Sequence, residues 1–279
     1  MWVGQQLADG LDFWGFLGSL ILGGIILGIY TGLLGYVGAK TGLSLDLLSQ
    51  RAFGEKGSYL PSAMTSFTQI GWFSVGSFVS GGTATPNFAR FAKNGKSGAI
   101  TTVVAFFIGN SLMFFFGAVS SIFVGGNDIF EVMVRLNLFY LAVLVLGLNI
   151  WTTNDNALYT AGLGLANIFH QRKKPMVLLS GIIGTVASVW LYYNFCGWLN
   201  ILNCTLPPVG MILVLAYFMN KEDFETDQPK LKTIDWFAVA GVILGAIVAN
   251  ILHWGIASIN GMVVAAVCYC VGQAVNKRK

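Results

Sequence analysis

The sequence predicts an all-α protein, a polytopic bundle of transmembrane helices, from its composition and the grouping of its apolar residues. Hydrophobic residues make up 55% of the 279 positions and charged residues only 10%, whereas soluble domains carry about 25% charged residues. The apolar residues are gathered in runs of about 20, the length with which a helix crosses a bilayer. The chain is therefore predicted to be a single transmembrane domain, residues 1–279.

The basic residues predict how these helices are oriented. A net charge of +4 is compatible with a nucleic-acid partner, but the Lys and Arg side chains lie in loops between the apolar runs. Such a bias marks cytoplasmic loops, and on this layout only Arg135 of the sixteen Lys and Arg faces outward. We therefore expect a multi-pass membrane protein with a cytoplasmic C-terminus and no nucleic-acid partner.

The first third of the chain predicts one full span and one unusual segment. Residues 13–38 form the first span, whereas residues 1–11 are too short to cross, and residues 41–59 form a loop or a surface helix. Residues 60–91 are too long for a simple span and are basic at both ends. The positive-inside rule places both ends in the cytoplasm. We therefore predict a re-entrant hairpin of two half-helices, with a flexible turn around Gly76 and Ser77.

The remaining elements follow from the later apolar runs. The expected spans are residues 99–124, 138–168, 175–195, 198–219, 236–252 and 256–275. An amphipathic surface helix is expected over residues 126–137. Pro207 and Pro208 are expected to kink or break the span in which they lie and not to form a site, because proline removes a helical hydrogen bond.

Polar residues in the middle of the span 138–168 are the first candidate site. Asn149, Thr152, Thr153 and Asn156 follow an i, i+3, i+4, i+7 pattern and share one helical face. Their amide and hydroxyl oxygens suit a hard cation such as Na⁺, and Asn also pairs with a polar ring compound. The alternative is hydrogen bonding to neighbouring helices, but intramembrane polar clusters usually mark transport pathways. Asp155 beside them is expected to pair with a neighbour, ligate a cation or reach the cytoplasmic side.

A second set of candidate residues lies around the predicted hairpin turn. Gln69 and Trp72 share a helical face, where an indole stacks on a flat heteroaromatic ligand and an amide reads its edge. The alternative for Trp72 is a packing or interfacial role. Phe78, Ser80 and Gly81 lie at a probable helix break, the kind of place where transporters build substrate sites. The alternative there is a plain flexible joint.

Enzymatic and ATP-driven functions find no support in the sequence. There is no GxxxxGK[ST] phosphate-binding motif. There is also no nucleophile–base pair that we can identify. A membrane transporter that does no chemistry on its substrate is the first hypothesis, and a membrane enzyme is the weakest.

Several segments resemble the nucleobase–cation symporter family over nearly the whole chain. They include LGIYTGLLGYVGAKTGL, TQIGWF, AFFIGNSLMF, LGLNIWTTNDNALY and GIIGTV, together with the Pro-Pro pair. The resemblance implies an inverted-repeat fold like that of the bacterial leucine transporter. It also implies uptake of a nucleobase such as cytosine, with Na⁺ as the coupling ion.

The resemblance also implies roles for individual residues. Those that match the family's substrate residues are Gln69, Trp72, Phe78, Ser80, Gly81 and Asn149. Those that match its Na⁺ ligands are Asn149, Thr152 and Thr153. At Gly81 the family pattern has Ala, which is a mild departure.

Two larger departures indicate a shortened member of the family. The cytoplasmic half of the family's first helix is expected to be absent, with the carbonyls that complete its cation site. A block of helices is expected to be missing at a join between Gly76 and Ser77. In this fold, transport moves one bundle of helices against the remaining helices. Because parts of both groups would be missing, a non-transporting membrane scaffold is the alternative function.

Overall fold

The structure is a computed structural model that describes residues 12–75, 81–125, 129–226, 228–229, 231–252 and 254–276. These residues form helices and their connections, without a strand among them. The predicted all-α fold is therefore confirmed for this part of the chain. The expectations for residues 1–11 and for the join at Gly76 and Ser77 fall outside the described residues.

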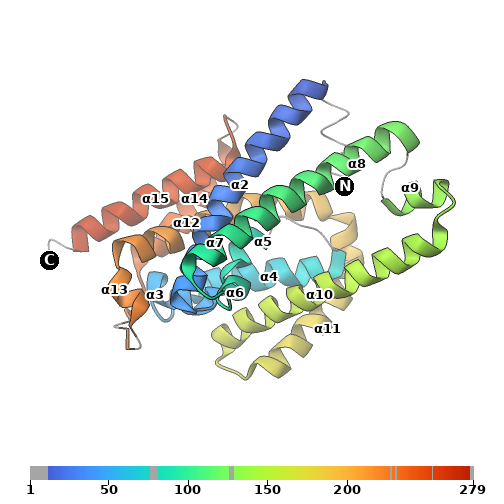
Figure 1. Cartoon of the computed structure of the whole chain (residues 1–279). Helices are drawn as coiled ribbons and strands as arrows, with labels where there is room; N and C mark the ends of the chain where they lie inside the picture. The colour runs from blue at the N-terminus through green and yellow to red at the C-terminus, as the bar shows by residue number, and fades with distance from the viewer. Residues whose placement is uncertain are drawn as a thin grey trace. The chain divides into compact units, whose positions relative to one another are not determined.

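The helices fall into two compact units, each described by itself. Unit 1 comprises Met1–Gly32 and Ile100–Thr153, and unit 2 comprises Leu33–Ala99 and Asn154–Lys279. The division falls within three helices: α2 (Phe13–Thr41), α7 (Gly95–Val104) and α10 (Phe139–Phe169) (Figure 1).

Unit 1 holds one part of each of these three helices and three further elements. The further elements are the one-turn π-helix η1 (Ala105–Gly109), α8 (Asn110–Val124) and α9 (Ile129–Arg135). Phe16 and Leu20 of α2 pack against Ala118 of α8 in a small buried cluster. The π-helix lies inside the predicted span 99–124, which otherwise continues unbroken, and π-bulges of this kind are frequent at functional sites.

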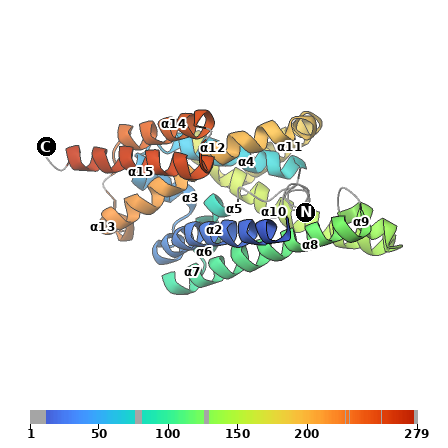
Figure 2. The same cartoon turned by 90° about the horizontal axis from the view of Figure 1, so that it is seen from above.

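Unit 2 holds the other nine helices. They are α3 (Leu45–Phe53), α4 (Tyr59–Val75), α5 (Gly81–Ala84), α6 (Pro86–Ala89), α11 (Lys173–Tyr193), α12 (Phe195–Met219), α13 (Lys221–Glu225), α14 (Trp236–Ile251) and α15 (Ala257–Asn276) in the described residues. Helices α14 and α15 lie side by side (Figures 1 and 2). Their backbones approach closely at Gly245 and Gly261, where an added Cβ on Gly245 would lie 2.6 Å from the Gly261 carbonyl oxygen.

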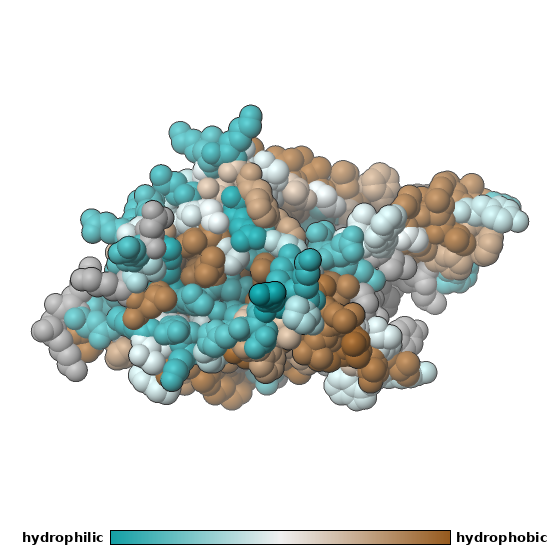
Figure 3. Space-filling model, turned by 90° about the horizontal axis from the view of Figure 1, so that it is seen from below, coloured by the Kyte–Doolittle hydropathy of each residue, from teal (hydrophilic) through white to brown (hydrophobic). Residues whose placement is uncertain are grey.

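Several of these helices are long and apolar enough to cross a membrane. Among the described residues they are Phe13–Thr41, Gly95–Val124, Lys173–Leu191, Gly197–Met219 and Ala257–Asn276. Large apolar side chains on them are exposed, such as Val186 and Trp190, and broad hydrophobic areas are visible on the face in Figure 3. The chain is therefore a multi-pass membrane protein, as predicted.

Helix α10 is not among these five, although the sequence predicts a span there. It has 31 residues, about 46 Å at 1.5 Å per residue, which is ample for a bilayer. Its polar run from Asn149 to Asn156 lowers the mean hydropathy of any window that contains it. Length and continuity support the predicted span, and hydropathy does not identify it.

The predicted break at Pro207 and Pro208 is wrong, because α12 runs through both prolines as one helix. Pro207 has no N–H for the carbonyl of Asn203, one turn earlier. The hydroxyl of Ser258 on α15 donates a hydrogen bond to that carbonyl at 3.0 Å. Neighbouring helices in membranes commonly satisfy carbonyls that proline frees. The helix therefore continues because α15 supplies the missing donor.

The segment 60–91 doubles back, as the predicted hairpin requires. Ser62 near its start donates to Asp46 at 2.6 Å, and Asn87 near its end accepts from the Leu45 N–H at 2.8 Å. A straight helix would separate Ser62 from Asn87 by about 37 Å, yet both contact the first turn of α3. The second arm differs from the prediction, because it is the short helices α5 and α6 instead of one half-helix.

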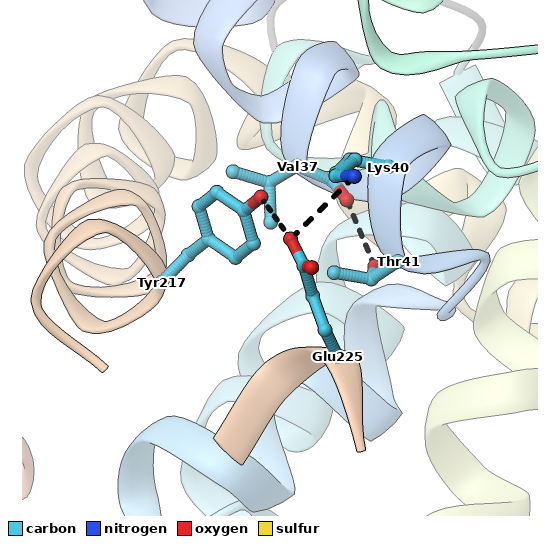
Figure 4. A network of polar contacts seen from close by, with 5 residues as sticks. All are labelled: Val37, Lys40, Thr41, Tyr217 and Glu225. Atoms are coloured by element: carbon cyan, nitrogen blue, oxygen red, sulfur yellow. Dashed lines mark hydrogen bonds and ion pairs between the residues drawn. The ribbon is translucent and has the colours of Figure 1, made fainter. Parts of the chain in front are cut away.

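Polar contacts join the end of α2 to the loops beyond α12. Glu225 on α13 accepts a hydrogen bond from the Tyr217 hydroxyl at 2.9 Å and lies 3.9 Å from the Lys40 ammonium (Figure 4).

The end of α3 lies against the segment before α14. Gly54 has a φ of +87°, and an added Cβ would lie 2.6 Å from the Lys232 carbonyl oxygen. Only glycine fits such a position without strain. This close approach holds the segment before α14 against the end of α3.

Replacing Ser258 with alanine tests how α12 tolerates its prolines. Ser258→Ala leaves the Asn203 carbonyl without its donor in an apolar setting, so we expect a loss of about 1 kcal/mol of stability. Thermal unfolding in detergent measures it. The control is Ser188→Ala, whose hydroxyl bonds to Thr185 in its own helix. Equal effects of the two substitutions would contradict the account.

Candidate functional site

The polar face of α10 is formed as predicted. Residues 139–169 are one continuous helix, so Asn149, Thr152, Thr153 and Asn156 lie on one side of it. The side chains of Asn149, Thr152 and Asn156 are exposed, and that of Thr153 is half-buried. These polar side chains are therefore not buried by packing, and their oxygens remain accessible.

The Thr152 hydroxyl is directed by its own helix. It lies 3.1 Å from the carbonyl oxygens of Leu148 and of Asn149, to which it donates. A hydroxyl has one proton and two lone pairs. The proton is engaged with the backbone, so the lone pairs are free to face a cation. The Thr152 hydroxyl thus has acceptor capacity to offer, whereas its proton is already in use.

Gln69 lies buried on α4, with 7% of its surface exposed. The same helix is fixed by close packing two residues further on, where an added Cβ on Gly71 would lie 2.2 Å from the indole of Trp198 on α12. Trp198 belongs to a buried cluster with Leu202 and Leu206. The absence of a side chain at Gly71 therefore sets the position of α4, a role that the sequence analysis did not assign to it.

The remaining predicted substrate residues are described only in part. Trp72 lies on α4, three residues after Gln69, and its side chain is outside the described part of the structure. Phe78 and Ser80 are outside the described residues. Gly81 is the first residue of α5. Gln69, Trp72 and Gly81 belong to unit 2, whereas Asn149, Thr152 and Thr153 belong to unit 1.

The structure also brings together a polar network that the sequence analysis missed. Gln50 on α3 donates to Asn167 on α10 at 2.6 Å. The Asn167 amide donates to Ser58 at 3.1 Å and to Ser62 at 2.9 Å. Ser62 donates in turn to Asp46 at 2.6 Å. The network links α3, α4 and α10 within unit 2. Its member Asn167 lies near the C-terminal end of α10, shortly before the basic residues 172–174.

The polar side chains of the candidate site bear on which metal ion it could hold. In the described residues, no group of three or more His, Cys, Asp or Glu lies close enough to hold a metal ion. The donors on α10 are neutral oxygens, which suit Na⁺ better than a transition metal. Chemically, the face can bind a hard monovalent cation and hydrogen-bond a polar ring, without a group that attacks a substrate.

Comparison with known proteins identifies relatives along the whole chain. Residues 1–84 and 74–275 match the sequence profile of a family described as permease for cytosine/purines, uracil, thiamine, allantoin. The two stretches overlap at residues 74–84, around the position where the sequence analysis expects a join.

Individual relatives agree with this family match. The cytosine permeases of Escherichia coli K12 and of E. coli O157:H7 are each 35% identical over 372 aligned positions, which cover 100% of this chain and 88% of the relative. Because this chain has 279 residues, 93 of those positions (372 − 279) have no counterpart in it. With matches that extend over both units, the chain belongs to the family of permeases for cytosine, purines, uracil, thiamine and allantoin, as a shortened member.

Proposed function

We propose that this protein transports a nucleobase, cytosine or a close relative, across the bacterial inner membrane into the cytoplasm. The observation that carries the proposal is the 35% identity to cytosine permeases over the full length of the chain. The exposed polar face of α10 supports it, because an apolar helix that crosses a bilayer keeps such a face only at a cost. The Lys and Arg residues in the loops between the apolar runs support a cytoplasmic C-terminus, because such residues mark the cytoplasmic side.

Substrate recognition is proposed for the residues that match the family pattern. Trp72 and Phe78 would stack on the ring, while Gln69, Asn149 and the backbone near Ser80 and Gly81 would pair with its polar edge. These are the residue types that a flat, amide-rich ring requires. Their proposed roles rest on the motif and on residue chemistry.

Coupling to Na⁺ is proposed for Asn149, Thr152 and Thr153. These side chains offer three neutral oxygens on one face of α10, and the proton of Thr152 is already directed to the backbone. A cation bound there needs further ligands, since hard cations take about six oxygens. The site is therefore expected to bind Na⁺ weakly unless other backbone carbonyls complete it.

A second candidate function is a membrane scaffold that binds a nucleobase without moving it. The specific observation that favours it is the absence of 93 positions present in the aligned cytosine permease. Alternating access moves one helix bundle against another around a midplane site. If the missing helices belong to those bundles, binding can survive where transport does not.

Substitution of Asn149 tests the substrate site. Asn149→Ala removes an amide that both donates and accepts, so we expect cytosine affinity to fall by about 10-fold to 100-fold. Equilibrium binding of labelled cytosine to the purified protein measures the change. The control is Asn200→Ala, an exposed amide on α12. Unchanged affinity in Asn149→Ala would remove Asn149 from the site.

Substitution of Thr152 tests the cation site separately. We expect Na⁺ to strengthen cytosine binding to the wild-type protein, and Thr152→Ala to lower this enhancement by about 10-fold, because one oxygen ligand is lost. Cytosine binding over a Na⁺ titration, with choline as the replacement cation, gives the measurement.

The matched control for Thr152→Ala is Thr185→Ala. The Thr185 hydroxyl also donates to a carbonyl of its own helix, that of Gly181 at 2.8 Å, so both substitutions remove the same kind of backbone contact. If both variants respond to Na⁺ as the wild type does, Thr152 is not a ligand. If the wild type shows no Na⁺ effect, the coupling ion is not Na⁺.

A further inference from the structure

A buried carboxylate in unit 2 has no role in the proposed transport site. Asp46 lies in the first turn of α3, outside the candidate spans, with only 5% of its surface exposed. Ionised carboxylates are almost never buried to this extent without a paired charge. The group therefore calls for an explanation of its own.

The surroundings of Asp46 are mostly neutral. Its carboxylate accepts a hydrogen bond from Ser62 at 2.6 Å. Gly164 allows α10 to come close to α3 and α4. An added Cβ there would lie 3.5 Å from a carboxylate oxygen of Asp46 and 2.1 Å from the Ser66 hydroxyl. The packing is thus tight on the α4 and α10 sides, and the acid is largely shielded from bulk solvent.

The hydrogen bonds run in one direction and converge on Asp46. Gln50 donates to Asn167, Asn167 donates to Ser62, and Ser62 donates to Asp46. The network joins three helices and ends on the only ionisable member. Any change in the charge of Asp46 is therefore felt by α3, α4 and α10 together.

Two buried hydroxyls on the same helices have no hydrogen-bond partner. Ser49 lies one turn after Asp46 on α3 and is fully buried, and Thr160 lies one turn before Gly164 on α10 with 2% exposed. Unpartnered buried hydroxyls in a native structure require a reason. Here they are donors that the packed arrangement leaves unused.

The charged and titratable groups on the surrounding elements mostly have other partners, although the Nε atom of Arg90 is buried without a hydrogen-bond partner. Arg90, after α6, is the charged group that acts on Asp46, and it also donates to the Tyr159 hydroxyl on α10. Tyr59 on α4 is hydrogen-bonded to His170. The remaining contacts are Glu225 with Tyr217, Asp235 with Lys232, and the Arg51 guanidinium with the Asp223 carbonyl.

We propose that Asp46 is a proton-binding site, and that its bound proton holds α3 packed against α4 and α10. In the packed arrangement the carboxyl group is enclosed and prefers to be neutral. When it releases its proton, the buried charge favours separation of these helices and entry of water. The ligand is the proton, which comes from the aqueous phase on the side of the Lys- and Arg-bearing loops.

The electrostatics of the site agree with this geometry. Burial raises the pKa of the Asp46 carboxyl from 3.8 to about 6, against smaller opposing effects of the Ser62 and backbone hydrogen bonds and of Arg90. A pKa raised by packing means that the packed form binds the proton more tightly than an open, hydrated form. Packing is therefore favoured fully below about pH 4, and the packed-to-open ratio falls by up to about 100-fold as pH rises through about 6.

The proton site is tested first by its own titration. Infrared difference spectra of the full chain in lipid nanodiscs, recorded between about pH 4 and pH 8, follow the protonated-carboxyl band. We expect a component with a midpoint near pH 6 that Asp46→Asn removes and that the exposed Asp223→Asn retains. A titration without that component, or one that persists in Asp46→Asn, would overturn the proposal.

The effect on packing is tested by hydrogen exchange in the same preparation. In wild-type protein, after correction for intrinsic rates, amides in residues 58–66 and 160–169 should exchange faster at about pH 7.5 than at about pH 5. In Asp46→Asn, which is neutral at both values, protection should stay the same. If wild type and variant change alike, the proton does not control packing and the proposal fails.

A second variant covers the case in which Asp46→Asn does not fold. Ser62→Ala removes the hydrogen bond that favours the ionised carboxylate, so the infrared midpoint should move upward. Ser188→Ala, a hydroxyl on α11 that bonds to its own helix, should leave it unchanged. An unmoved midpoint in Ser62→Ala would contradict the assignment. None of these measurements uses a nucleobase, so their outcome is independent of the transport proposal.

Discussion

The constraint on which this structure depends is that a polar group removed from water needs a partner within the protein. In a bilayer an unsatisfied backbone group costs several kcal/mol. The chain meets this demand by staying helical even where its sequence favours a break. At Pro207 the freed carbonyl of Asn203 is taken by Ser258, from a helix 55 residues away in sequence. Threonine hydroxyls follow the same rule, since Thr31, Thr65 and Thr68 donate to carbonyls of their own helices.

The same constraint separates polar residues with a structural role from those available for function. The network of Gln50, Ser62 and Asn167 runs to Asp46 and joins three helices within unit 2. On the polar face of α10, by contrast, Asn149, Thr152 and Asn156 are exposed and Thr153 is half-buried. Polar groups that the fold does not use are available to a ligand, which is why we propose this face as the site for a nucleobase and a cation.

Much of the fold was predictable, because long apolar runs specify membrane helices almost alone. The expected spans 13–38 and 99–124 agree with Phe13–Thr41 and Gly95–Val124 to within a few residues. The continuity of α12 was not predictable, since proline signals a break locally and its rescue by Ser258 is a tertiary contact. The two short helices α5 and α6, where one half-helix was expected, were not predictable from the local sequence either.

The candidate site was predictable only where it lies on one helix. Helical periodicity placed Asn149, Thr152 and Thr153 together, and the structure keeps them on one face. The Asp46 network was missed because its members are up to 117 residues apart, and the loop around α3 showed no motif. The role of Gly71 was likewise hidden, since only the packed Trp198 shows why a side chain is excluded there.

The most direct test of the central claim is uptake of labelled cytosine into proteoliposomes that contain the full chain, driven by an inward Na⁺ gradient. The account predicts accumulation above that of empty liposomes, which collapses when the Na⁺ gradient is dissipated. Saturable binding of cytosine to folded protein without any accumulation would contradict transport, and would identify the chain as the binding scaffold that its missing segments favour.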